Sequence, residues 1–148
     1  MGAKWNRIRI EIPKGINPEN RELLASEIIE HIRDLASQGR GYTQATGRVR
    51  KFPKYSKDYA EWKGQTNVDL ALSNEMLEDI KLLSHRSGSL LIGFEKGTES
   101  NAKADGNQTG SYGRPSGDAS KARPFLGITK ADMSRIIERV ALEREEDG

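Results

Sequence analysis

Few side chains of this chain could act as acid and base or hold a metal ion. The 148 residues contain no cysteine and only two histidines, His31 and His85. This excludes a disulfide framework, a thiol nucleophile and a zinc site built on cysteine. No Gly-x-Ser-x-Gly motif occurs, and the sequence around the histidines shows no catalytic setting. We therefore expect no enzymatic activity, no cofactor and no metal site.

Three carboxylates, Glu75, Glu78 and Asp79, fall on a short expected helix. Glu75 and Asp79 are four residues apart and would share one exposed face. Such a pair could serve as general acid and base or bind a divalent cation. Nothing else in the sequence supports this chemistry, and a solvated helix face explains the spacing equally well. His85 would follow the same helix, where a protonated imidazole interacts favourably with the helix dipole.

Residues 40–66 form a basic-aromatic segment, with seven basic residues against two acidic ones and five of the nine aromatic residues. Basic side chains neutralise phosphates and aromatic rings stack on bases, so the segment could bind nucleic acid. Protein interfaces favour the same residue types, and no nucleic-acid-binding motif is present. Our candidates for interaction are Arg48, Arg50, Lys51, Phe52, Tyr55, Tyr59, Trp62, Lys63, Arg123 and Phe125.

Residues 95–124 are predicted to be a long glycine-rich loop or arm, because they contain no Leu, Ile, Val or Phe. A loop of this length in a small domain is usually functional or disordered. It lacks the Gly-Lys-Ser/Thr ending of a phosphate-binding loop. We expect a flexible arm that becomes ordered on a partner.

The first part of the chain shows clear patterns. Ile8, Ile10 and Ile12 alternate with charged residues, which predicts a half-buried strand. Apolar residues then recur every three or four positions, which predicts a helix over about residues 18–38. Its start is marked by an asparagine followed by proline and its end by Gly39.

Shorter elements are expected further along. Alternation predicts a strand over residues 67–72, and a run of apolar residues predicts a buried strand over 89–94, with a short helix from about 73 to 83 between them. A short strand at 125–128 leads into a C-terminal helix, whose Thr129 and Asp132 have the spacing of a capping box. The strands are not separated by regular crossover helices, so we expect antiparallel pairing.

The predicted architecture is a single α+β domain of residues 1–148. A small antiparallel sheet is packed by the long N-terminal helix and the C-terminal helix. Leu, Ile, Val and Phe together make up 20% of the residues, 30 of 148, and the formal net charge is +2. The core is therefore small, although disorder throughout is excluded. No apolar stretch approaches the 18 residues of a membrane span, so we expect a soluble protein.

Four segments resemble tailed-bacteriophage morphogenesis proteins, specifically the tail-completion and head–tail joining (neck) proteins. The first is residues 52–64, with the sequence FPKYSKDYAEWKG. Residues 68–77, 92–94 and 123–128 are similar to further stretches in the same order. The resemblance covers about residues 18–140, but residues 95–122 match little.

The resemblance implies a structural virion protein that assembles as a ring in the neck or at the tail end. It implies no catalytic residue. The protein would be located in the virion and, before assembly, in the host cytoplasm. The implied partners are further copies in a six- or twelvefold ring, head connector or adaptor proteins, and tail terminator or tail tube proteins. Phage DNA would pass through the lumen without sequence-specific binding, and no membrane is involved. The alternative is a small nucleic-acid-binding module using the basic-aromatic segment.

Overall fold

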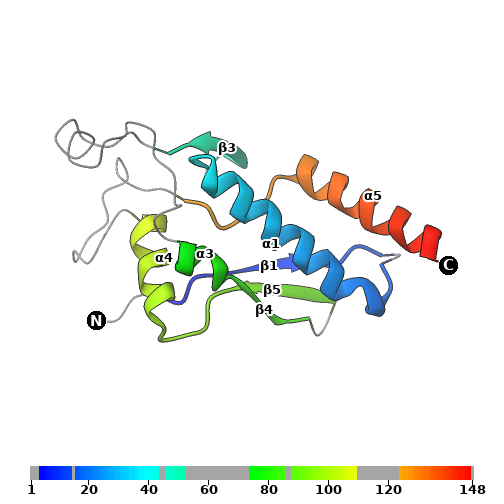
Figure 1. The fold of residues 1–148 in the computed structure, drawn as a ribbon, viewed down its shortest axis with the longest axis horizontal. Helices are drawn as coiled ribbons and strands as arrows, with labels where there is room; N and C mark the ends of the chain where they lie inside the picture. The colour runs from blue at the N-terminus through cyan, green and yellow to red at the C-terminus, as the bar shows by residue number, and fades with distance from the viewer. Residues whose placement is uncertain are drawn as a thin grey trace.

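The computed structural model describes residues 4–14, 16–43, 46–52, 74–85, 88–109 and 124–147, with the backbone alone for the last seven. The elements in chain order are β1 (Arg7–Glu11), the 3-10 turn η1 (Pro18–Asn20), α1 (Arg21–Ser37), β2 (Arg40–Thr43), β3 (Arg48–Lys51), α3 (Asn74–Glu78), β4 (Lys81–Ser84), β5 (Ser89–Gly93), α4 (Glu99–Thr109) and α5 (Lys130–Asp147) (Figure 1).

The main sheet has three antiparallel strands in the order β1-β5-β4. β5 is central, and its Ile92 lies opposite Ile8 of β1 and Leu82 of β4. Leu90 and Ile92 are fully buried, whereas Arg7 and Arg9 on the alternate positions of β1 are exposed. The alternation in the sequence therefore marks the face of the sheet that carries the core.

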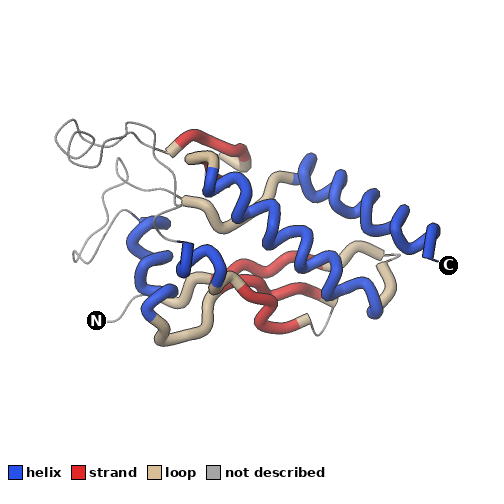
Figure 2. Tube along the Cα trace, viewed as in Figure 1, coloured by secondary structure: helices blue, strands red, loops and turns tan. Residues whose placement is uncertain are grey.

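Helix α1 covers the apolar face of the sheet. Leu24, Ile28 and Ile32 are each 0% exposed and belong to the same core as the β5 residues. On its other side α1 contacts α5, so that α1 lies between the red sheet and α5 in Figure 2. This arrangement confirms the predicted α+β fold with a small antiparallel sheet, in which the N-terminal helix packs on the sheet and the C-terminal helix packs on α1.

The ends of α1 follow the sequence signals closely. The proline at position 18 begins a 3-10 turn, and the α-helix continues from Arg21. At the other end, Gly39 has a φ of 76°, in the left-handed region that favours glycine. Its N–H donates to the carbonyl oxygen of Ala36 at 3.1 Å, which closes the last turn.

Arg33 of α1 holds the short helix α3 in place. Its Nε donates to the carbonyl oxygen of Leu77 at 2.8 Å, and its Nη2 donates to those of Glu78 at 2.7 Å and Ile80 at 3.3 Å. A five-residue helix is too short to be stable alone, and its last carbonyls have no partner within the helix. The guanidinium therefore caps α3 and joins it to α1.

The helix predicted for about residues 73–83 is wrong in its second half. α3 ends at Glu78, and Lys81–Ser84 forms β4, hydrogen-bonded to β5. Leu82 lies opposite Ile92, so pairing with the central strand decides the conformation over the local helical spacing. His85 consequently follows a strand, and the predicted interaction with a helix dipole does not exist.

Helix α4 lies inside the predicted loop of residues 95–124, so this part of that prediction is wrong. The helix buries one apolar side chain, that of Ala104. Its hydrogen bonds to other segments include those from Ser100 to Asp79, between Asn101 and the backbone of residues 4 and 6, and from the amides of Phe125 and Leu126 to Gln108 Oε1. The helix is thus attached through polar groups.

The strand predicted at residues 125–128 is absent. Residues 124–129 carry no regular secondary structure, and two of their N–H groups are bonded to a side chain of α4. The predicted cap of the following helix is confirmed, since the N–H of Asp132 donates to Thr129 Oγ1 at 3.1 Å.

The strand predicted for residues 67–72 lies outside the described residues, as do residues 53–66 and 110–123 of the two predicted contact segments. Within the part of the chain that the structure describes, no helix has the length and apolar character needed to cross a membrane.

Candidate interaction surface

The described part of the basic-aromatic segment begins with a β-hairpin, β2–β3. Gly47 has a φ of 66°, and its N–H donates to the carbonyl oxygen of Thr43 at 2.8 Å, which forms the turn. At the base of the hairpin, the N–H of Phe52 donates to the carbonyl oxygen of Gly39 at 2.8 Å. Tyr42 and Val49 lie directly opposite each other, a pairing of residues with high strand propensity.

Two glycines allow the hairpin to lie against residues 124–128. A Cβ atom on Gly41 would overlap the carbonyl oxygen of Pro124 and lie 2.9 Å from the Cα of Phe125. A Cβ on Gly127 would lie 2.8 Å from ring atoms of Tyr42. A side chain at either glycine would therefore collide with the backbone of residues 124–125 or with the ring of Tyr42. This close packing fixes the orientation of the hairpin.

The hairpin carries four exposed cations, Arg40, Arg48, Arg50 and Lys51. Its sequence from residue 40 to 52 contains no acidic residue, and no described carboxylate lies within ion-pair distance of the four. Arg40 and Lys51 are directly opposite each other in the register. Like charges in this position repel, so the hairpin carries a repulsion that a negatively charged partner would remove.

A groove of about 650 Å³ separates the hairpin from the start of α5. Tyr42, Val49 and Ile128 supply apolar lining, and the charged residues at the same groove are Arg48, Lys130 and Asp132. We call the four cations and this groove the hairpin surface. It combines positive charge with adjacent apolar area, which is the composition of a protein contact rather than of a catalytic site.

The structure places three of the predicted interaction candidates on one strand and two in the core. Arg48 and Arg50 lie on one face of β3 and Lys51 on the other, and all three are exposed. Phe52 is 7% and Phe125 1% exposed, so their prediction as interaction residues is wrong. The remaining candidates lie outside the described residues: Tyr55, Tyr59, Trp62, Lys63 and Arg123.

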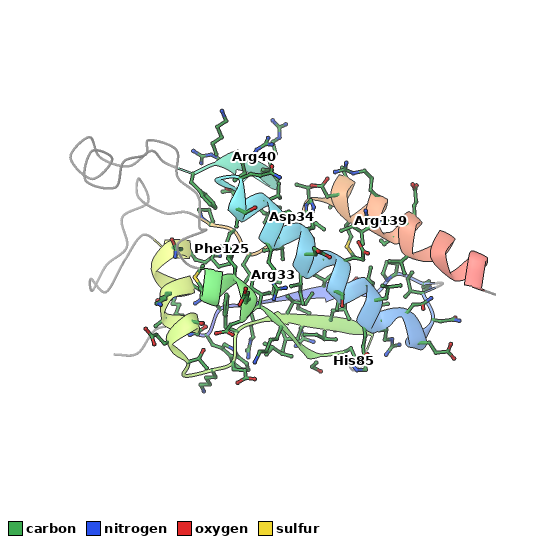
Figure 3. All side chains as sticks on the ribbon, in the orientation of Figure 1. Arg33, Asp34, Arg40, His85, Phe125 and Arg139 are labelled. Atoms are coloured by element: carbon green, nitrogen blue, oxygen red, sulfur yellow. The ribbon has the colours of Figure 1, made fainter. Side chains whose placement is uncertain are left out.

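The two corrected phenylalanines are buried for identifiable reasons. The ring of Phe125 meets that of Phe94 edge to face, with centroids 6.2 Å apart at an interplanar angle of 77°. Phe52 lies against Gly41 at the base of the hairpin. Figure 3 shows the difference from the surface cations, with Arg40 at the outer edge of the molecule and Phe125 below it. Arg40 was not among the predicted candidates. It belongs to the hairpin surface because the register places it opposite Lys51.

A second group of charges lies between α1 and α5. Asp132 pairs with Arg135 on its own helix, and its Oδ2 lies 3.2 Å from His31 Nε2. This nitrogen is buried and makes no hydrogen bond to a described residue. Burial lowers the pKa of His31 most, Arg135 and Arg139 lower it further, and Asp34 acts in the opposite direction. The net effect is a pKa of His31 below its usual value, which favours the neutral imidazole.

His31 should make the fold less stable in mildly acidic solution. Its pKa is lower in the folded than in the unfolded chain, so the unfolded chain binds the proton first as the pH falls below 6.5. The free energy of unfolding should then decrease by up to about 1.4 kcal/mol per pH unit between pH 6.5 and the pKa of the folded state. His31→Gln should flatten this slope in urea titrations between pH 7.5 and 5.5. His85→Gln, at an exposed position, is the matched control, and an unchanged slope in His31→Gln would contradict the assignment.

The pair considered as acid and base, Glu75 and Asp79, lies partly outside the described residues. Asp79 follows the end of α3 and accepts a hydrogen bond from Ser100 Oγ. The side chain of Glu75 is outside the description, and Glu78 is exposed. Among the described residues there is no group of three or more histidine, aspartate or glutamate side chains that could hold a metal ion. The hairpin surface is therefore the strongest candidate for function on the described chain.

Comparison of the chain with protein-family models, with curated proteins and with solved structures finds no significant match. Its function has to be argued from the sequence and the geometry of the chain.

Proposed function

We propose that the chain is a structural virion protein of a tailed phage, which forms a ring at the head–tail junction or at the tail end. It would serve tail completion or head–tail joining and would have no enzymatic activity. The observation that carries the proposal is the order of the four segments that resemble neck and tail-completion proteins, spread over about residues 18–140.

All four of these segments contribute described residues to the core, and two of them contact each other there. Phe94 ends the segment of residues 92–94, and Phe125 lies in the segment of residues 123–128. Their rings pack edge to face and are both buried. A resemblance confined to exposed residues would carry less weight, because residues of the core are the ones that related folds share.

The hairpin surface gives such a protein a contact site outside its core. Proposed partners are further copies of the chain in a six- or twelvefold ring, the head connector or adaptor proteins, and tail terminator or tail tube proteins. Phage DNA would pass through the lumen without being read in sequence. The protein would reside in the virion neck or tail, and in the host cytoplasm before assembly.

Native mass spectrometry of the recombinant chain and electron microscopy of purified virions test this proposal. We expect closed rings of a single size, and density for the protein at one end of the tail. Rings form when head-to-tail contacts repeat with a rotation that closes. A protein that is absent from purified particles and forms no ring in any assembly state would contradict the proposal.

A free nucleic-acid-binding module is the second candidate, because the hairpin carries four cations and no described anion compensates them. This function predicts binding to DNA or RNA that weakens steeply with salt. Neutralising Arg48, Arg50 and Lys51 would then reduce the salt dependence. Gel-shift experiments without binding at low salt would exclude it.

A further inference from the structure

Two regions of opposite charge occur at separate places on the described chain. The hairpin carries four exposed cations and no acidic residue, and the one acidic residue of the adjacent groove, Asp132, pairs with Arg135. The acidic end of α5, residues 143–147, has the sequence EREED, with four carboxylates and one arginine. α5 is helical to Asp147, so these residues continue the helix.

The acidic end of α5 is held away from the hairpin of its own copy. The first residues of α5 line the groove beside the hairpin, which fixes the start of the helix there. α5 has 18 residues, and at 1.5 Å per residue it extends about 27 Å. It runs from the hairpin toward the opposite side of the molecule in Figure 1. The opposite charges within one copy therefore do not meet.

We infer that the hairpin surface of one copy receives the acidic end of α5 from the next copy. The inference rests on the proposed ring and names the contact that would build it. Because the two surfaces differ and lie apart, the contact is heterologous, and its repetition gives a ring when the rotation closes.

The charges would determine which surfaces meet more than how tightly they bind. Exposed ion pairs add little affinity individually, but complementary charge selects the partner surface and sets its orientation. The groove beside Arg48 adds apolar area from Tyr42, Val49 and Ile128. The contact should therefore weaken with salt and depend strongly on the sign of both surfaces.

Charge reversal on each side tests the contact. One variant carries Arg48→Glu with Arg50→Glu, and the other carries Glu145→Lys with Glu146→Lys. Sedimentation velocity of nuclease-treated protein at about 0.1 M salt measures association, and circular dichroism checks folding. We expect each variant alone to need at least a tenfold higher concentration than the wild type to assemble. An equimolar mixture should assemble like the wild type, because each hairpin then meets an end of opposite charge.

The control variant, Lys4→Glu with Lys96→Glu, changes the net charge equally at two exposed positions away from both surfaces, and it should assemble normally. Assembly of either reversed variant at the same concentration as the wild type overturns the inference but does not contradict the proposed ring. Failure of the mixture to assemble also overturns it. If the wild type assembles only without nuclease treatment, the inference is overturned, and nucleic acid is the partner of the hairpin. A wild-type protein that never assembles contradicts the proposed ring as well.

Discussion

Replacing Gln108 by leucine is expected to lower the free energy of unfolding by about 2–4 kcal/mol. Gln108 Oε1 accepts two hydrogen bonds, from the backbone N–H of Phe125 at 2.7 Å and from that of Leu126 at 3.1 Å. Both of these residues are buried, and leucine offers no acceptor, so two N–H groups would lose their partner. Leucine has a similar volume to glutamine, so loss of packing contributes little.

Gln108→Glu is the matched control, because a carboxylate oxygen at the same position can accept both bonds. Urea denaturation should show a loss of less than about 1 kcal/mol for this variant. Equal losses for Gln108→Leu and Gln108→Glu would show that the acceptor oxygen is not what holds residues 124–128 to α4.

Gly41→Ala is expected to destabilise the fold by about 3 kcal/mol. The added Cβ would overlap the carbonyl oxygen of Pro124 and lie 2.9 Å from the Cα of Phe125. Both obstacles are backbone atoms, so a rotamer change cannot relieve the clash, and the hairpin has to move away from residues 124–128. Thermal unfolding followed by circular dichroism measures the loss.

Gly47→Ala separates this steric effect from the general effect of replacing a glycine in the hairpin. A Cβ on Gly47 meets nothing within 4 Å, but its φ of +66° disfavours alanine. That conformation costs about 1–2 kcal/mol. If Gly41→Ala is no more destabilising than Gly47→Ala, the close approach of β2 to residues 124–128 does not determine the position of the hairpin.

The parts of the fold that the sequence predicts well are those held by apolar side chains. Leu24, Ile28 and Ile32 repeat with the period of a helix, and Ile8 and Ile10 with the period of a strand. Burial in the core follows these periods directly. α1, β1 and β5 could therefore be predicted, together with the antiparallel α+β class.

Helix α4 was missed because its buried face is polar. This face consists of residues at helical spacing: Ser100, Asn101, Ala104, Asn107 and Gln108. The first four are each at least nine-tenths buried. A search for apolar periodicity does not detect this set. A search for amide and hydroxyl side chains at helical spacing would have detected it, although the backbone groups they bind are fixed only by the tertiary structure.

The hairpin surface could be predicted in part. The basic residues of β3 are evident in the sequence, but the contribution of Arg40 depends on the register with Lys51. The aromatic residues misled the prediction, because ring size favours both interfaces and cores. The burial of Phe52 and Phe125 follows from the approach of distant segments, and short-range patterns contain no information about it.

The polar attachment of α4 also affects how the molecule responds to temperature. Burial of apolar surface weakens on cooling and accounts for the large heat-capacity change of unfolding. The contact of α1 with the sheet is of this kind. α4 instead buries one alanine and otherwise exchanges hydrogen bonds with water for hydrogen bonds with the side chain of Asp79 and with the backbone of two other segments. Its attachment therefore changes less with temperature than the core beside it, and in the cold it contributes a larger share of the cohesion of the domain.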